Sequence, residues 1–407
     1  MTIRADAFSG ICQTNARITN IGELSDYCTF SPQIFPFTNM QITAAVARSP
    51  KAPLTIEQID LEAPRLNEVL VRLVATGVCH TDIAMRDQAY PVPQPIVLGH
   101  EGSGIVVEVG AGVTKVKPGD HVVMTYSSCG HCESCLENQP TCCHDFFGRN
   151  FGGSRVDGST ALTKGAEKIH GNFFGQSSFA TYSICNERNI VKVRSDVPLE
   201  LLGPLACGVQ TGAGSIINAL KVGTGKNLAI FGVGSVGLSA VMGARLAGAG
   251  TIIAVDVHED RLKMALELGA THMINARNQS PIDHIMKITG SGVHYSLETT
   301  SLPDVIRQAV ESLTLRGTCG ILGASPVGTE VSLDVVHLMT AGRKIRGIVE
   351  GESVPELFVP RLIDLYLQGR FPFDKLIQFY PLNEINRAID DSENGRAIKP
   401  VLRIGSV

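Results

Sequence analysis

Short apolar runs, broken by Gly, Pro and polar residues, fill the first part of the chain. The segments 68–78, 102–110 and 119–125 (EVLVRLVATGV, GSGIVVEVG and GDHVVMT) are typical of short buried or half-buried strands. We therefore expect a compact β-rich domain from Ile42 to about Val123. Residues 144–180 are rich in Gly, Ser and Phe and lack a regular period, so this stretch is predicted to form loops.

The pattern changes near residue 208, where apolar runs begin to alternate with segments of helical spacing. The predicted strands are 227–232, 251–256, 271–276, 294–300 and 317–324, and the predicted helices are 235–250, 258–270 and a segment near 303–315. Strands that alternate with helices predict a parallel sheet covered on both faces.

This alternation sets the expected domain boundaries within an α/β fold. Residues 209–347 are predicted to form a cofactor-binding domain. An apolar helix at 355–369 and a closing strand at 398–405 are expected to fold back onto the first domain, so the catalytic domain comprises 40–208 and 348–407. Residues 1–39 are polar and aperiodic and are predicted to be a disordered extension.

Composition and charge narrow the classes of function. The chain has 407 residues, of which 44% are apolar and 18% charged, and a formal charge of −4. This balance offers no basic surface for nucleic acid, and no apolar run is long enough to span a membrane. The N-terminal segment lacks the apolar core of a signal peptide. We therefore expect a cytoplasmic protein whose eleven cysteines are reduced.

A glycine array at 232–237 (GVGSVG) follows a predicted strand and opens a predicted helix. Gly232 allows the tight turn, Gly234 lets a pyrophosphate approach the backbone, and Gly237 lets the helix sit close to the sheet. Asp256 closes the next strand, where its carboxylate can bind the ribose hydroxyls and repel a 2′-phosphate. The array therefore favours NAD over NADP, although a Gly-rich turn beside an ordinary acid is the alternative. Arg261 is either a ribose contact or a solvated helix charge.

A second motif concentrates cysteines in one loop, CGHCESCLENQPTCC at 129–143. Its spacing lets a short loop wrap four thiolates around one tetrahedral Zn²⁺ and leaves no position open, so the site is predicted to be structural. Cys142 is an alternative to the last ligand, and an iron–sulfur or redox cluster is an alternative to zinc. The predicted ligands are Cys129, Cys132, Cys135 and Cys143.

A third set is scattered along the chain. Cys79, His100 and Cys207 lie in separate segments, and Glu101 follows the histidine. Two thiolates and one imidazole would form a three-ligand zinc site with a fourth position free for water or substrate, as catalysis requires. Each residue alone is more often a packed core side chain, so the set does not establish the site by itself.

Together these segments resemble a known family. GHEGSGIVVEVGAGV at 99–113 fits the pattern G-H-E-x2-G-x5-G-x2-V of zinc-containing alcohol dehydrogenases, and CHTD at 79–82, the cysteine loop and GVGSVG follow in the family's order. The chain resembles the medium-chain zinc-dependent alcohol dehydrogenases from about residue 42 to 407. The segments 79–88 and 171–193 are most similar to the aryl-alcohol (benzyl-alcohol) branch.

The resemblance implies a GroES-like β-rich catalytic domain and a Rossmann-type, doubly wound cofactor domain. It also implies that Thr81 contacts the substrate oxygen and that Glu101 is an outer or exchanging ligand of the catalytic zinc. In the same way, Asp82 orients the ligand histidine, and His80 and Lys399 contact the cofactor. Some relatives end their proton relay at a histidine where this chain has Ala84. Here the relay would end through water, the ribose hydroxyls or Arg86, unless Arg86 is only a salt-bridging surface residue.

The sequence therefore predicts a reversible, NAD-dependent oxidation of primary aromatic or allylic alcohols to aldehydes, with two zinc ions per chain. Tyr90 is expected near the substrate entrance. The expected partners are a small-molecule alcohol or aldehyde and further copies of the chain in a homodimer or homotetramer, with no nucleic acid and no membrane. A glutathione-linked formaldehyde dehydrogenase is the second hypothesis, and a zinc-thiol redox sensor is a remote third.

Overall fold

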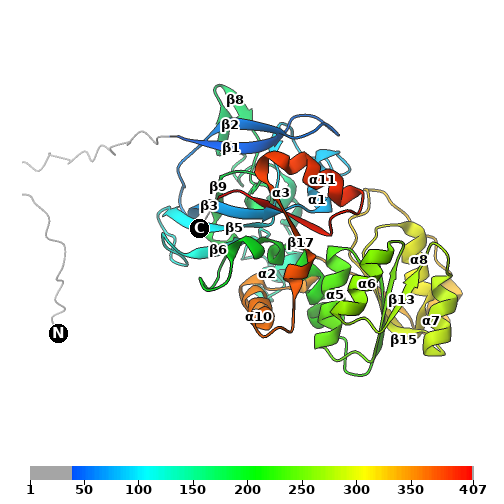
Figure 1. Cartoon of the computed structure of the whole chain (residues 1–407). Coiled ribbons are helices and arrows are strands. Elements are labelled where there is room, and N and C mark those ends of the chain that lie inside the picture. Colours follow the sequence, from blue (N-terminus) through cyan, green and yellow to red (C-terminus); the bar gives the residue numbers. More distant parts are fainter. Residues whose placement is uncertain (1–38, 406–407) are drawn as a thin grey trace, which may run out of the picture. The chain divides into compact units, whose positions relative to one another are not determined.

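The computed structural model describes residues 39–405 (Figure 1). The predicted extension 1–39 lies outside the described residues except for Asn39, and the first strand, β1, begins at Met40 as the sequence suggested. Among the described residues, no helix combines the length and apolar character that a membrane crossing requires.

The β-rich part contains two mainly antiparallel sheets. The first sheet has the order β4 (Ile96–Val97), β1 (Met40–Ala47), β2 (Thr55–Leu61), β7 (Leu162–Lys164) and β8 (Glu167–Ile169). The second has the order β10 (Ile190–Lys192), β6 (His121–Met124), β5 (Gly102–Val109), β3 (Glu68–Gly77), β18 (Lys399–Arg403) and β17 (Ile377–Pro381), and β9 (Tyr182–Asn186) also pairs with β3. Because β18 pairs antiparallel with β3, the end of the chain returns to the first part, as predicted.

The second part is a six-stranded parallel sheet, which confirms the predicted alternation. Its order is β13 (His272–Asn275), β12 (Thr251–Asp256), β11 (Asn227–Phe231), β14 (Val293–Glu298), β15 (Leu313–Ile321) and β16 (Lys344–Gly347). In Figure 1, α5 (Ser235–Leu246) and α6 (Glu259–Leu268) cover one face, and α7 (Pro281–Thr289) and α8 (Pro303–Glu311) cover the other. The strand order reverses between β11 and β14, the place where sheets of this kind bind their ligands.

Side chains alternate between the two faces of this sheet. Leu228 and Ile230 of β11 pack into the cluster on the α5 and α6 side. Ala229 and Phe231 pack into a separate cluster with residues of α7 and α8. Both faces are therefore apolar, which explains why the strands appear in the sequence as unbroken apolar runs.

The remaining helices are short except near the C-terminus. They are α1 (His80–Arg86), α2 (Glu133–Leu136), α3 (Phe146–Phe151), α4 (Gly208–Gly214), α9 (Val335–Thr340), α10 (Pro355–Leu367) and α11 (Ile385–Glu393). Two predictions need correction. The segment 144–180 is not all loop, because it contains α3, β7 and β8, which are too short to show a period. The helix predicted near 303–315 ends at Glu311, because Leu313 already begins β15.

Candidate active site

Three segments that are far apart in the sequence bring two thiols, an imidazole and a carboxylate to one point. Cys79 precedes α1, His100 follows β4, and Cys207 lies between the turn Gly203–Ala206 and α4. The possible ligand atoms of these residues and of Glu101 all lie within 4.8 Å of one another. His100 Nε2 is 3.2 Å from Cys207 Sγ. The structure thus brings together the scattered set proposed from the sequence.

Asp82 holds the neighbouring groups in place. Its Oδ2 accepts a hydrogen bond from the backbone N–H of Cys79 (3.0 Å), and its Oδ1 accepts one from Gly99 (3.0 Å). Oδ1 also lies 2.9 Å from His100 Nδ1. A carboxylate at Nδ1 keeps the proton there, so Nε2 presents its lone pair to the cluster. Two thiols and an imidazole of this tautomer form a donor set that fits Zn²⁺.

The two thiols of the cluster, half-buried Cys79 and buried Cys207, differ in acidity. A hydrogen bond with Cys207 lowers the pKa of Cys79 well below its usual value, although burial opposes the shift. The same interaction, together with burial, raises the pKa of Cys207. The pair therefore shares one proton, which a bound divalent cation would displace because metal ligation requires the thiolate.

Glu101 is paired with a lysine. Lys399 Nζ lies 2.8 and 3.0 Å from the two carboxylate oxygens of Glu101, and both side chains are buried. Burial raises the pKa of Glu101, and Lys399 opposes that effect. The resemblance implies that Lys399 contacts the cofactor. In the structure its ammonium group is paired with the Glu101 carboxylate, so the cofactor contact stays a prediction. His80, the other predicted contact, is exposed at the start of α1.

The predicted proton relay has a clear beginning but no side chain at its end. Thr81 is half-buried beside the cluster, with its Oγ1 3.7 Å from Cys79 Sγ. Ala84, on the same helix, offers no proton acceptor. Arg86 forms an ion pair with Asp87 at 2.6 Å, which agrees with its structural interpretation rather than with a role in the relay.

One buried carboxylate next to the cluster was missed in the sequence. Glu350 directly follows the loop after β16, and its Oε1 lies 3.8 Å from Cys207 Sγ. Its Oε2 accepts hydrogen bonds from Gln210 Nε2 (3.2 Å) and Thr211 Oγ1 (3.3 Å). Burial raises the pKa of Glu350 to about 7. The available signal was an acid beside a glycine, Gly351, just past the end of a parallel strand, where sites in such sheets form.

Aromatic rings extend outward from His100. The ring of Phe174 stacks on His100 with centroids 4.5 Å apart. Phe151 meets Phe174 edge to face at 5.1 Å, and Tyr90 stacks on Phe151 at 6.4 Å. Tyr90, expected near the substrate entrance, is thus connected to the cluster through a row of rings.

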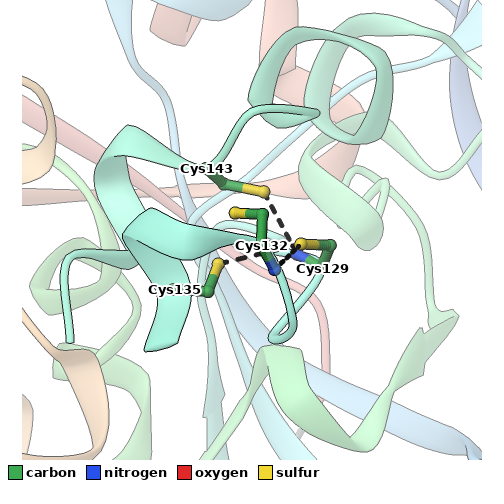
Figure 2. A group of neighbouring side chains, drawn as sticks. All are labelled: Cys129, Cys132, Cys135 and Cys143. Atoms are coloured by element: carbon green, nitrogen blue, oxygen red, sulfur yellow. Dashed lines mark hydrogen bonds between the residues drawn. The ribbon is translucent and has the colours of Figure 1, made fainter. Parts of the chain in front are cut away.

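The cysteine loop forms a second, local cluster (Figure 2). Its four sulfur atoms lie within 4.8 Å of one another, and Cys129 Sγ accepts a hydrogen bond from the backbone of Cys132 at 3.3 Å. Cys143 Sγ accepts one from the backbone of Cys129 at 3.2 Å. Cys142 is exposed and lies outside this group, so the geometry favours Cys143 as the fourth member.

The acidities of these thiols also favour a metal site over a cluster of metal-free thiols. Although burial opposes it, hydrogen bonds from the backbone of His131 and Cys132 lower the pKa of Cys129 to about 6. Burial raises the pKa of Cys135 to about 12. A cation between the four sulfurs would stabilise all of them as thiolates, and four sulfur donors leave no position for a substrate.

The glycine turn joins β11 to α5 at the reversal of strand order. Gly232 has a φ of +84°, which favours glycine. A Cβ on Gly237 would lie 2.0 Å from the Gly232 carbonyl oxygen, so the helix packs directly on the turn. A Cβ on Gly234 would meet no protein atom closer than Arg261 Nη1, at 3.9 Å. The space beside Gly234 is therefore open to a ligand.

Asp256 and Arg261 lie beside this turn. The carboxylate of Asp256 accepts hydrogen bonds from the backbone of Val233 and Val257, both at 2.7 Å, and of His258 at 2.9 Å. Asp256 thus tethers the turn to the end of β12. Within the described part of the chain, the buried Nε of Arg261 has no hydrogen-bond partner, so it has a donor available for a ligand at the turn.

The two halves of the candidate site are neighbours. Gly208, the residue after Cys207, packs against α5 at its start, where a Cβ would lie 3.5 Å from Ser235 Oγ and 3.6 Å from Val236. The metal-binding set and the glycine turn therefore meet where α4 contacts α5.

Known proteins share these features. Residues 65–195 match the family described as alcohol dehydrogenase GroES-like domain, and residues 235–367 match the zinc-binding dehydrogenases. The chain is 46% identical to a geraniol dehydrogenase of Castellaniella defragrans (88% of this chain and 96% of that protein) and 37% identical to an S-(hydroxymethyl)glutathione dehydrogenase of Paracoccus denitrificans (89% and 100%). The crystal structure of benzyl alcohol dehydrogenase from Acinetobacter calcoaceticus superposes with a TM-score of 0.88 at 48% identity, covering 90% of this chain and all of that one. The chain therefore belongs to the zinc-dependent medium-chain alcohol dehydrogenase family.

Proposed function

We propose that this alcohol dehydrogenase oxidises primary aromatic or allylic alcohols to aldehydes with NAD, at a zinc ion held by Cys79, His100 and Cys207. The observation that carries the proposal is the junction of α4 and α5, which puts a Cys2His donor set, with His100 and Cys207 buried and Cys79 half-buried, next to a nucleotide-type glycine turn. When bound, zinc supplies a Lewis acid that lowers the pKa of the alcohol, and NAD supplies the hydride acceptor.

The side chains of this protein would orient the donors and move the proton. Asp82 holds the imidazole of His100 in the tautomer that a metal requires. Thr81 would take the proton of the alcohol, and its half-buried position connects the cluster with solvent. Because Ala84 has no acceptor and Arg86 is paired with Asp87, we infer that the proton leaves through water or the ribose hydroxyls.

The aromatic row supports the substrate class. Phe174, Phe151 and Tyr90 extend from the histidine ligand, and flat conjugated alcohols pack well against such rings. Conjugation also stabilises the aldehyde product. Two relatives, a geraniol dehydrogenase and a benzyl alcohol dehydrogenase, are named for alcohols of this class.

The test measures NADH formation with benzyl alcohol, geraniol, ethanol and S-hydroxymethylglutathione, together with the zinc content of the same sample. We expect rapid turnover of benzyl alcohol or geraniol and about two zinc ions per chain. Phe151→Leu should raise the KM for benzyl alcohol more than that for ethanol. Phe147→Leu is the matched control, because its ring is 66% exposed and contacts Phe151 from outside. Absence of turnover with all four alcohols in zinc-loaded protein would refute the proposal.

A glutathione-linked formaldehyde dehydrogenase is the second candidate. The match to the Paracoccus denitrificans relative covers 89% of the chain, compared with 88% for the geraniol dehydrogenase, at a lower identity of 37% against 46%. A preference for S-hydroxymethylglutathione over benzyl alcohol would establish this alternative and keep the same metal chemistry.

We also propose how the chain is organised. Residues 40–208 and 348–407 form the catalytic domain, 209–347 form the cofactor domain, and Cys129, Cys132, Cys135 and Cys143 hold a second, structural zinc. Strand β16 is an exposed edge of the parallel sheet, and on nearby α9 Val335 and Met339 are each 71% exposed. Exposed edges and apolar side chains of this kind favour association, so we expect a homodimer or homotetramer joined through this part. Light scattering on wild type and Met339→Asp tests the interface.

A further inference from the structure

Glu350 is a buried carboxylate beside the catalytic cluster that belongs to none of the family's motifs. We propose that Glu350 binds the catalytic zinc as its fourth ligand when no alcohol is present, and that the alcohol displaces it. This inference rests on the proposed assignment of Cys79, His100 and Cys207 to zinc. It differs from the role expected of Glu101, which the structure pairs with Lys399.

The first argument is the distance from the Glu350 carboxylate to the sulfur of Cys207, a proposed ligand of the same metal. A zinc ion binds sulfur at about 2.3 Å and carboxylate oxygen at about 2.0 Å, so two such ligands in tetrahedral geometry lie about 3.5 Å apart. Glu350 Oε1 is 3.8 Å from Cys207 Sγ. With respect to this sulfur, the carboxylate lies within a few tenths of an ångström of the separation of two ligands on one ion. The group of ligand atoms within 4.8 Å of one another contains Glu101 and not Glu350, so ligation also requires Glu350 to turn toward Cys79 and His100.

The second argument is missing countercharge. Among the described residues, the hydrogen-bond donors to the Glu350 carboxylate oxygens are Gln210 and Thr211, at 3.2 and 3.3 Å, and the thiol of Cys207 at 3.8 Å. All are uncharged and longer than the contacts usual for a carboxylate. A buried carboxylate without a cation is costly, whereas a metal at the neighbouring cluster would supply the missing positive charge.

The third argument is the backbone that presents the side chain. Glu350 has a φ of +47°, and so has Glu352, with Gly351 at +63° between them. Left-handed conformations of residues other than glycine cost free energy and persist where the surroundings enforce them. Here Ser353 fixes the turn, since its Oγ donates to the Glu350 carbonyl at 2.7 Å or to Gln210 Oε1 at 2.9 Å. The turn thus holds an unfavourable conformation that directs this carboxylate inward.

The test compares zinc-loaded wild type with Glu350→Gln and Glu350→Asp. Glutamine can still accept the hydrogen bonds from Gln210 and Thr211 but is a poor zinc ligand, so it separates a structural role from ligation. Glu352→Gln is the matched control, because Glu352 lies in the same turn and pairs with Arg346 instead of facing the cluster. Thermal unfolding of each variant confirms that the fold is retained.

Two readouts decide the question without measuring turnover. The variant Cys79→Ser lacks the catalytic zinc, so the phase of zinc release that is missing in this variant belongs to that ion. In this phase, transfer of zinc to a chelator should be at least about 10-fold faster in Glu350→Gln than in wild type. It should be unchanged in Glu352→Gln. In cobalt-substituted protein, imidazole binding followed by visible absorption should be about 10-fold tighter in Glu350→Gln if the carboxylate fills the position nine-tenths of the time. Glu350→Asp should lie between the two.

Each other outcome overturns the inference in a distinguishable way. Unchanged imidazole affinity in Glu350→Gln refutes ligation, even if zinc loss is faster, because the effect is then only electrostatic. Unchanged zinc loss and unchanged imidazole affinity leave Glu350 a structural residue while the proposed function stands. Absence of a Cys79-dependent zinc in wild type removes the proposed function as well.

Discussion

The glycine turn supports a sharp test, because the structure gives two of its glycines opposite surroundings. A Cβ on Gly237 would lie 2.0 Å from the Gly232 carbonyl oxygen, and that neighbour is backbone that cannot rotate away. Relieving the overlap requires the helix and the turn to separate by on the order of 1 Å in a close-packed region. Overpacking of this kind costs about 1–3 kcal/mol. Gly237→Ala should therefore lower the Tm by roughly 2–10 °C.

Gly234→Ala should behave in the opposite way. The residue has φ −74° and ψ −160°, an extended conformation that alanine adopts, and its Cβ would meet only Arg261 at 3.9 Å. Because the substitution restricts the unfolded chain, the Tm should stay equal or rise slightly. The added methyl group would instead keep the pyrophosphate away from the backbone. Loss of one charge-assisted hydrogen bond, about 1.5–3 kcal/mol, corresponds to roughly 10- to 150-fold weaker binding.

The assay pairs thermal unfolding with NADH binding measured by fluorescence titration on both variants. We expect the Tm to fall only in Gly237→Ala, and the NADH affinity to fall in Gly234→Ala without a loss of Tm. Wild-type affinity in Gly234→Ala would refute the assignment of this turn to the dinucleotide. Equal Tm values in the two variants would refute the packing argument.

Substitutions at four further positions test other parts of the molecule. Cys79→Ala should remove one zinc and abolish turnover with little change in Tm, whereas Cys132→Ala should remove the other zinc and lower the Tm first; metal analysis and calorimetry would reveal the reverse pattern. Asp256→Gly should shift the ratio of NADPH to NADH affinity toward NADPH and also lower the Tm, because three backbone donors lose their acceptor; Asp256→Asn should shift the ratio with a smaller loss of Tm. Hydrogen bonds from Arg48 lower the pKa of Glu57 from 4.5 to about 2, so this carboxylate stabilises the fold above pH 4.5 and its contribution is lost as the pH falls toward 2. Glu57→Gln should therefore lower the Tm at neutral pH, and the difference from wild type should shrink below about pH 4; a constant difference would contradict this.

Features fixed by local sequence were predicted well. The glycine array, the spacing of the cysteine loop and the alternating strands and helices each depend on residues close together in the chain. The return of the closing strand to β3 also followed from its apolar pattern at the chain end. The Cys79, His100 and Cys207 set was different, since its proximity depends on pairing between distant strands. Their residue types suggested a three-ligand zinc set, but no local spacing linked them, so the set depended on the resemblance to a family until the structure brought the residues together.

Other features needed the three-dimensional structure for physical reasons. A strand of three residues, such as β7 or β8, carries no detectable period, so the hairpin at 162–169 was taken for loop. A lysine is usually exposed to solvent or bound to a phosphate. Only the pairing of β18 with β3 shows that Lys399 is buried and in contact with Glu101. Glu350 sits in a turn with positive φ, a conformation that sequence patterns rarely indicate for an acid.

The charges around the Cys79, His100 and Cys207 cluster are the reason why we expect different roles for its two carboxylates. Glu101 and Lys399 form a buried pair of zero net charge, so Glu101 can bind a metal only by giving up or sharing its lysine. Glu350 has no cationic partner among the described residues, so it would not have to break an ion pair to bind a metal. Two thiolates would neutralise a divalent ion, and Glu350 would then add one negative charge, which the ion would stabilise more strongly than the uncharged donors Gln210 and Thr211 do. An alcohol that has lost its proton would carry the same charge, so its exchange for this carboxylate would leave the summed charge of the ion and its bound ligands unchanged.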